Sequence, residues 1–310
     1  TCIIWNPHTA EKLTTLNDHT RAVTGLAWHP DGDLIATTRD DRTCIIWNPH
    51  TAQKLTTLTG HTRGVTLAAW NSTGNLIATT NHDCACTIWN PHTGEVATTL
   101  TGHTHEMTGI AWHPLDDLIA TSGDDRTCII WKPDTGERIL TLTGHTAAVT
   151  GVAWSPDGTH LATTSNDHTC IIWKPNTGER ILTLTGHTAA VTGVAWSPDG
   201  THLATTSNDH TCIIWNPNTR KPITTLTGHT SRVTGVAWRP TGDLIATADA
   251  SGLIRISHLD GTLERAFISV RPRVPGVESY ASWTPQGLDV LEGEAWRVLR
   301  VPEPGGGSRR

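Results

Sequence analysis

The sequence is poor in aromatic residues other than tryptophan, poor in charge and free of long apolar runs. Its 310 residues contain one Tyr, one Phe and one Met, and only 17% of them are charged. The formal net charge of −6 gives no basic surface that would attract nucleic acid or an anionic membrane. No apolar stretch approaches the roughly 18 residues of a membrane-spanning helix. We therefore expect a soluble chain with neither nucleic acid nor membrane as a partner.

Short motifs for cofactors and catalysis are also missing. There is no Gly-rich phosphate loop, no dinucleotide-binding fingerprint and no G-x-S-x-G element, so we expect no cofactor. We expect no signal peptide, because the sequence starts at Thr1 in the middle of a pattern and not with a charged and apolar leader. The start in mid-pattern suggests either a fragment of a longer protein or a deliberately trimmed chain.

Tryptophan, by contrast, occurs 14 times, and most copies are periodic. A period of 42 residues connects two tryptophan series and one histidine series, and segments 127–168 and 169–210 differ only at Asp134 and Asn176. Such regularity indicates one structural unit copied many times. The series are Trp5, Trp47, Trp89, Trp131, Trp173, Trp215, then Trp28, Trp70, Trp112, Trp154, Trp196, Trp238, and finally His19, His61, His103, His145, His187, His229.

Each copy contains four short β-rich runs. In the unit 143–184 these are residues 149–154, 160–164, 169–173 and 180–184, separated by Pro, Gly, Asn and Asp. The connections are too short for a crossover helix, so neighbouring strands must be antiparallel. A four-stranded sheet of this size cannot bury both faces alone, whereas sheets stacked around an axis can. We predict an all-β protein, a β-propeller of four-stranded antiparallel blades.

The expected domain organisation is a single propeller over residues 1–301 with seven blades. Residues 269–301 repeat the pattern in a degenerate form and are predicted to form the closing blade. Glu11–Leu16 are expected to supply the outer strand of that blade, because circular closure removes two open sheet edges. The predicted segments are a half blade (1–17), six repeat units (18–59, 60–101, 102–143, 144–185, 186–227, 228–268), the closing blade (269–301) and a flexible tail (302–310).

Three features of the unit resemble the WD-repeat propeller family over about residues 1–268. They are a Gly-His pair between units, an Asp six residues before a Trp, and that Trp itself. The near-identity of the repeats resembles bacterial WD-repeat arrays. The sequence departs from the family after the Trp, where Asn or Lys replaces Asp, and at Asp18, which replaces the Gly of the first Gly-His pair.

The resemblance implies that a His, an Asp, a strand Thr and a Trp hydrogen-bond in series in each blade and fix the loop to the sheet. A His, an Asp and a hydroxyl are also the layout of a nucleophilic triad. One enzyme needs one active site, so five copies favour a structural network, and we predict no catalytic residue and no enzyme. The matching positions are His19, Thr37, Asp41 and Trp47; His61, Thr79, Asp83 and Trp89; His103, Thr121, Asp125 and Trp131; His145, Thr163, Asp167 and Trp173; and His187, Thr205, Asp209 and Trp215.

Six of the seven cysteines fall three residues before a periodic Trp, where a small buried apolar side chain is expected. Equivalent positions in adjacent blades are too far apart for a disulfide, so the thiols should be free, as in a reducing cytoplasm. His82, Cys84 and Cys86 form an H-x-C-x-C run. Zinc sites usually need wider spacing and a fourth ligand, so we predict no metal site.

Differences between the copies concentrate just after the Gly-His pair and just before the turn Asp. The resemblance implies that these positions line one face around the central channel, which the family commonly uses for partners. Ordinary solvated loops would vary in the same way, so both interpretations stay open. The candidate partner-binding residues, including a ring of Thr hydroxyls, are Arg21, Thr24, Asp40, Arg63, Thr66, His82, Glu106, Thr108, Asp124, Thr150, Asn166, Thr192, Asn208, Arg232 and Thr234.

The function expected from these features is a non-catalytic scaffold or sensor module that binds a protein or peptide. The resemblance implies a cytoplasmic, monomeric propeller that belongs to a larger multidomain signalling protein. One alternative is a structural or engineered repeat array without its own ligand. Another is a small-molecule-binding or enzymatic propeller that uses the channel, for which the blade containing His82–Cys86 is the most distinctive.

Overall fold

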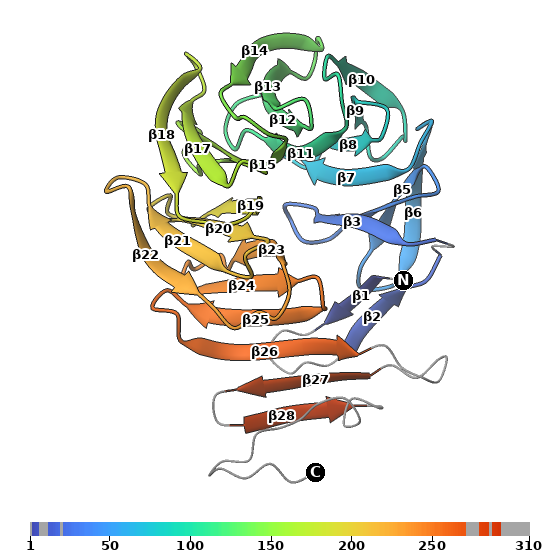
Figure 1. The fold of residues 1–310 in the computed structure, drawn as a ribbon. Coiled ribbons are helices and arrows are strands. Elements are labelled where there is room, and N and C mark those ends of the chain that lie inside the picture. Colours follow the sequence, from blue (N-terminus) through green and yellow to red (C-terminus); the bar gives the residue numbers. More distant parts are fainter. Residues whose placement is uncertain (1, 6–11, 19–20, 271–278, 285–286, 293–310) are drawn as a thin grey trace. The chain divides into compact units, whose positions relative to one another are not determined.

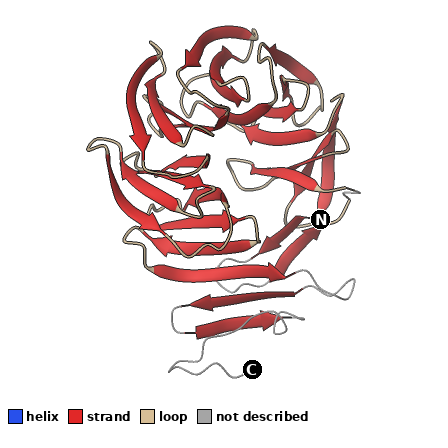
Figure 2. Ribbon diagram, viewed as in Figure 1, coloured by secondary structure: helices blue, strands red, loops and turns tan. Residues whose placement is uncertain are grey.

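The computed structural model of the protein describes residues 2–5, 12–18, 21–270, 279–284 and 287–292. Within these ranges the chain consists of strands and loops, with no helix (Figure 2). No helix long and apolar enough to cross a membrane occurs in this part of the chain. The prediction of an all-β protein is therefore confirmed.

Successive repeats form four-stranded antiparallel sheets in which the strands follow chain order (Figure 1). These sheets confirm the predicted blades. Blade 1 contains β3 (Val23–Trp28), β4 (Ile35–Arg39), β5 (Thr43–Asn48) and β6 (Gln53–Thr59). Blade 2 contains β7 (Val65–Trp70), β8 (Ile77–Asn81), β9 (Ala85–Trp89) and β10 (Val96–Thr101). Blade 3 contains β11 (Met107–Trp112), β12 (Ile119–Gly123), β13 (Thr127–Lys132) and β14 (Glu137–Thr143).

The later repeats continue the same order. Blade 4 contains β15 (Val149–Trp154), β16 (Leu161–Ser165), β17 (Thr169–Lys174) and β18 (Glu179–Thr185). Blade 5 contains β19 (Val191–Trp196), β20 (Leu203–Ser207), β21 (Cys212–Asn216) and β22 (Lys221–Leu226). Blade 6 begins with β23 (Val233–Trp238), β24 (Leu244–Asp249), β25 (Leu253–His258) and β26 (Leu263–Val270).

The prediction of seven blades is wrong, because the described residues form six. Strands β27 (Ser279–Thr284) and β28 (Gly287–Glu292) extend the sheet of blade 6 to six strands instead of starting a new blade. Strand β27 pairs with the outer strand β26, with Val270 opposite Ser279. An outer strand has unpaired backbone N–H and C=O groups, and a following antiparallel strand satisfies them directly. Residues 293–301 and the predicted tail 302–310 lie outside the described residues.

A two-stranded sheet precedes blade 1. It consists of β1 (Cys2–Trp5) and β2 (Lys12–Leu16), with Cys2 opposite Leu16 and Trp5 opposite Lys12. In blade 1 the third and fourth strands pair in the same register, with Cys44 opposite Leu58 and Trp47 opposite Lys54. The sheet thus has the pairing of the third and fourth strands of a repeat.

Among blades 1 to 4 the core lies between the sheets of successive blades. In blade 1, Cys44 and Leu58 pack with Trp70 and Trp89 of blade 2, all of them buried. Burial raises the pKa of the Cys44 thiol to about 12, so the thiol remains neutral and packs as a small apolar group. All seven cysteines are free. Single sheets that are apolar on both faces become stable only by this stacking.

By contacts between Cα atoms, the chain divides into two compact units, residues 1–194 and 195–310, with the boundary inside β19. The first unit contains β1, β2 and blades 1 to 4. Within it, the first strands of successive blades contact each other: β3 contacts β7, β7 contacts β11, and β11 contacts β15.

The turn between the first two strands of a blade requires glycine at one position. In blade 4, Gly158 N donates to Ser155 O over 2.8 Å and has a φ of +71°, which favours glycine. A Cβ atom at Gly158 would come within 2.3 Å of the His113 ring of blade 3. The Pro-Asp-Gly sequence therefore serves both the turn and the contact with the preceding blade.

Candidate functional site

The Gly-His loop and the Asp turn of each unit lie at the same end of its blade. In blade 4, Val149 at the start of the first strand pairs with Ser165 at the end of the second. The loop that leads into β15 and the turn that leaves β16 are therefore neighbours. This end of the blade contains both the predicted networks and the predicted partner-binding residues.

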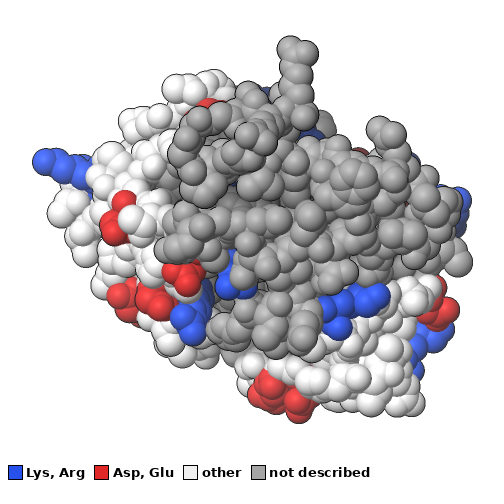
Figure 3. Space-filling model, turned by 90° about the horizontal axis from the view of Figure 1, so that it is seen from below, with Lys and Arg blue, Asp and Glu red and all other residues white. Residues whose placement is uncertain are grey.

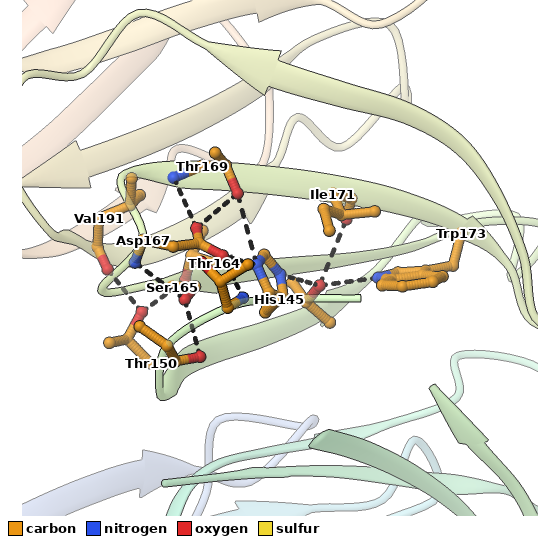
Figure 4. A network of polar contacts seen from close by, with 12 residues as sticks. His145, Thr150, Thr164, Ser165, Asp167, Thr169, Ile171, Trp173 and Val191 are labelled. Carbon is orange, nitrogen blue, oxygen red and sulfur yellow. Dashed lines mark hydrogen bonds and ion pairs between the residues drawn. The ribbon is translucent and has the colours of Figure 1, made fainter. Parts of the chain in front are cut away.

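In blade 4 the predicted residues form one continuous hydrogen-bonded series (Figure 4). Trp173 Nε1 donates to Thr163 Oγ1 over 2.7 Å, Thr163 Oγ1 lies 2.9 Å from His145 Nε2, and His145 Nδ1 lies 2.9 Å from Asp167 Oδ2. An indole can only donate and a carboxylate can only accept. The series therefore assigns a neutral imidazole with its proton on Nδ1, which donates to Asp167 while Nε2 accepts from Thr163.

The surroundings of His145 and Asp167 keep the imidazole neutral and the carboxylate charged. Burial lowers the pKa of His145 and outweighs the attraction of Asp167 for its charged form. Burial raises the pKa of Asp167, but hydrogen bonds from Thr169, Thr146 and His145 outweigh it and hold that pKa below its usual value. The aspartate is thus charged and the histidine neutral near pH 7.

Blade 3 has the same geometry. His103 Nδ1 lies 2.8 Å from Asp125 Oδ2, His103 Nε2 lies 2.9 Å from Thr121 Oγ1, and Trp131 Nε1 donates to the same hydroxyl over 2.8 Å. In blades 1 and 5 the described part of the series is the Trp-to-Thr bond, which is 2.8 Å long in both. These bonds join Trp47 to Thr37 and Trp215 to Thr205. His19 lies outside the described residues.

Blade 2 departs from this arrangement. His61 Nε2 lies 2.7 Å from Thr79 Oγ1, but His61 Nδ1 faces Asn81 Nδ2 at 3.1 Å. Asp83 pairs with Arg63 at 2.9 Å and accepts from Asn81 Nδ2 over 3.2 Å. Asn81 Oδ1 accepts from the Asp83 N–H, which fixes the orientation of the amide. The amide must then donate to Nδ1, so His61 carries its proton on Nε2. Burial lowers the pKa of His61 to about 4.

Blade 6 contains a network that the sequence reasoning missed. His229 Nδ1 lies 3.0 Å from Asp249 Oδ2, and His229 Nε2 lies 2.8 Å from Thr247 Oγ1. Asp249 precedes the position of the other turn aspartates by two residues, and Ser257 occupies the position of the Trp. The membership of His229 in the histidine series was the signal that could have revealed this network.

Comparison with known families agrees with the propeller blades. The family model of the WDR19 first beta-propeller matches residues 110–274, more than half of the chain, and the model of the WD domain, G-beta repeat, matches residues 10–48 and 52–90. The chain belongs to the WD-repeat β-propeller family. No curated protein matches the sequence.

The triad-like groups of the WD-repeat networks are closed to substrates. Thr121 and Thr163 have no exposed surface, and His103 and His145 are also buried. Each hydroxyl already lies between an indole and an imidazole. A nucleophile needs an open approach to the reacting carbon, so these groups can hold the loop to the blade but cannot attack a bound molecule.

One pair of the predicted rim residues lies in contact across neighbouring loops. His82 of blade 2 lies 3.1 Å from Glu106 of blade 3, in addition to the Arg63–Asp83 pair within blade 2. Arg21, Asp40, Asp124, Asn166, Asn208 and Arg232 are exposed. Figure 3 shows another side of the chain, where small separate groups of acidic and of basic side chains lie on the described surface.

Three hydroxyls of the predicted Thr ring join one blade to the next. Thr24 donates to Val65 O over 2.5 Å and Thr150 donates to Val191 O over 2.5 Å, in each case on the first strand of the next blade. Thr108 makes the equivalent bond to Val149 O. Thr66 instead contacts Thr80 of its own blade at 2.9 Å, and Thr234 donates to Ala248 O of its own blade over 3.4 Å.

Metal-ligand chemistry finds no support in the described part of the WD-repeat chain. No group of three or more His, Cys, Asp or Glu side chains in these residues converges on a point that could hold an ion. His82, Cys84 and Cys86 likewise do not form such a group. Cys86 is buried in the core between blades 2 and 3, whereas Cys84 lies in the turn with a φ of +59°.

Proposed function

We propose that this WD-repeat chain is a non-catalytic interaction module that binds a protein or peptide. Its binding face is formed by the loops after the Gly-His pairs and the turns before the aspartates. The observation that supports this most directly is the meeting of residues that differ between the copies, such as His82 and Glu106, 3.1 Å apart. Propeller domains of this family generally mediate protein interactions.

The chemistry of this face favours a polar partner that carries both signs of charge. Arg63 and Glu106 are more than half exposed, so their charges are available to a partner but strongly screened by water. Such rim charges contribute mainly to orientation and association rate. Binding at this face should therefore be sensitive to salt.

The proposal also places the module in the cytoplasm, as part of a larger signalling protein. The seven free cysteines support a reducing compartment. The place in a larger signalling protein is supported by the family resemblance alone.

The test is affinity capture from the source cells with quantitative comparison of variants. Arg63→Glu combined with Glu106→Lys reverses charge on the proposed face, and Glu137→Lys reverses an exposed charge at the other end of blade 3. The proposal predicts that the first variant loses its specific partner while Glu137→Lys keeps it, with unchanged thermal unfolding in both. Equal capture by all three proteins would refute the assignment of the face.

A further inference from the structure

The third strand of blade 6 differs from its counterparts at two positions that are apolar elsewhere. In the core between blades 2 and 3, Ile129 and Trp131 of β13 are both buried. The equivalent positions of β25 hold Arg255 and Ser257. The cluster between blades 5 and 6 contains neither of these two; its buried members are Ala204, Cys212, Ile214, Leu226 and Ile245. A charged and a polar side chain thus replace two large apolar ones.

The guanidinium of Arg255 occupies the place that the far end of the indole has in blade 3. A Cβ atom at Gly102 would lie 2.9 Å from Trp131 Cη2. At the equivalent Gly228 of blade 6, a Cβ atom would lie 3.0 Å from Arg255 Cζ, 3.0 Å from Nη2 and 3.1 Å from Nη1. Because these distances are nearly equal, the guanidinium plane faces Gly228. Its N–H groups therefore point along that plane and not at the glycine.

The charge of Arg255 has no counter-ion in its surroundings. Within the described part of the chain, its side chain forms neither an ion pair nor a hydrogen bond. Asp249, the turn carboxylate of this blade, is bonded to His229 and Ser251 instead. Burial lowers the pKa of Arg255, and it lowers the pKa of His229, which the charge of Arg255 lowers further. A partly buried cation without a counter-ion is unfavourable, and a bound anion offsets that cost.

Hydroxyl groups lie on the same face of the sheet as Arg255. Thr247 is paired with Arg255 across β24 and β25. In blades 3 and 4 the equivalent threonine accepts a hydrogen bond from the indole, whereas Thr247 contacts only the His229 imidazole among the described side chains. Ser257 is buried and follows Arg255 by two residues, so both side chains leave β25 on one face. This layer of blade 6 therefore combines a guanidinium with a serine hydroxyl.

We propose that Arg255 anchors a binding site for one phosphate group between blades 5 and 6. The planar N–H groups of arginine match the oxygens of phosphate, and the hydroxyl of Ser257 supplies a further donor. Compared with Ile129 and Trp131, the two residues of blade 6 have about five fewer non-hydrogen atoms, as many as one phosphate ion contains. Gly228 is exposed and Arg255 partly so, which gives the ion a route from solvent.

The site lies within one part of the molecule and is independent of the proposed interaction face. Gly228, Thr247, Arg255 and Ser257 all belong to the second compact unit. None of them is among the residues assigned to partner binding. The phosphate group is either the free ion or a phosphoryl group on a side chain, and the experiment distinguishes these two sources.

The experiment is a titration of the full chain with inorganic phosphate, followed by the phosphorus NMR signal at constant ionic strength. The signal should broaden saturably in the presence of the unaltered protein. Arg255→Gln should weaken binding about tenfold or more, because it removes the charge and the paired donors. Ser257→Ala should weaken it less. Arg239→Gln is the matched control: it removes an exposed arginine of the same blade that pairs with Asp243, and should leave binding unchanged.

A second variant separates loss of the site from loss of the fold. Arg255→Ile combined with Ser257→Trp restores the residues of blade 3 in blade 6. The introduced indole can donate to Thr247, so this variant should unfold at the same or a higher temperature than the unaltered protein without phosphate. Phosphate should raise the unfolding temperature of the unaltered protein and leave that of the double variant unchanged.

Three outcomes would overturn the proposal. The first is equal broadening of the phosphate signal by the unaltered protein and by Arg255→Gln, and the second is an equal loss of binding in Arg239→Gln, which would indicate diffuse attraction. The third is competition by acetate as effective as that by phosphate, which would assign the site to carboxylates. Displacement of inorganic phosphate by O-phosphoserine supports a phosphoryl group on a side chain as the ligand, and failure to displace it supports the free ion.

Discussion

Blades 2 and 4 hold the same loop to the same sheet with different histidine chemistry. In blade 4 the imidazole of His145 donates to Asp167, whereas in blade 2 the imidazole of His61 accepts from Asn81 and Asp83 turns outward to Arg63. The residue that causes the change is Asn81, where blade 4 has Ser165. A larger amide in this position displaces the carboxylate. The comparison shows that the buried end of the network is fixed and its outer end is adjustable.

Truncation of the indole tests the fixed end and should have the largest effect. Trp173→Ala and Trp89→Ala remove fully buried side chains and one hydrogen bond each, and should lower the free energy of unfolding by about 3 to 5 kcal/mol. Urea denaturation of both variants provides the measurement. The two costs should agree, and a difference well outside error would show that the buried ends of the two blades are not equivalent.

Acid should distinguish the two histidines. The pKa of His61 is lowered to about 4 from an ordinary value of 6.5, so the unfolded chain binds this proton more readily than the folded chain. The stabilisation is complete above about pH 6.5 and is lost as pH falls towards 4. For a shift of this size the loss is about 3 kcal/mol.

The measurement is the free energy of unfolding at several pH values between 7 and 4. His61→Gln should flatten this pH dependence more than His145→Gln does, because the charge of Asp167 favours protonated His145 and offsets part of its burial. A larger flattening by His145→Gln would contradict the assigned difference between the blades.

Removal of the turn carboxylates tests the adjustable end. Asp167→Ala leaves the buried Nδ1–H of His145 without its acceptor and should cost about 1 to 3 kcal/mol. Asp83→Ala removes a partner of the exposed Arg63 and a long hydrogen bond from Asn81, whose amide keeps its bond to His61, and should cost less, about 1 kcal/mol. The midpoints of chemical denaturation of the two variants, compared with that of the unaltered protein, measure the two costs. Equal costs would mean that Asp83 supports its blade as much as Asp167 does.

The smallest expected effect concerns the joints between blades. Thr150→Val removes the hydroxyl that donates to Val191 O and should cost about 0.5 to 1.5 kcal/mol. In blade 2 the hydroxyl of Thr66 stays within its own blade, so Thr66→Val should cost less. Thermal unfolding measured side by side can resolve the difference. A larger loss for Thr66→Val would show that the bond between blades adds little.

Much of the architecture could be predicted from the period alone. The strands of blade 4 begin and end within a residue of the expected runs, because alternating apolar residues and Pro-Asp-Gly turns act locally. The seventh blade could not be predicted reliably. A run such as 279–284 is compatible with a first strand or with an added outer strand, and the pairing with β26 decided between them. Local pattern specifies that a strand forms, but not which edge it joins.

The sequence by itself determined the repeat, the four-stranded blade and the residues of the networks in blades 3 and 4, because these depend on spacing within one unit. Only the tertiary structure decided which partner each polar group takes. Asn81 takes the place of a carboxylate at His61, Asp249 serves His229 from an earlier position, and Thr150 reaches the next blade. Such choices depend on distances of a few tenths of an ångström between side chains far apart in the chain, and the spacing of residues carries no information about those distances.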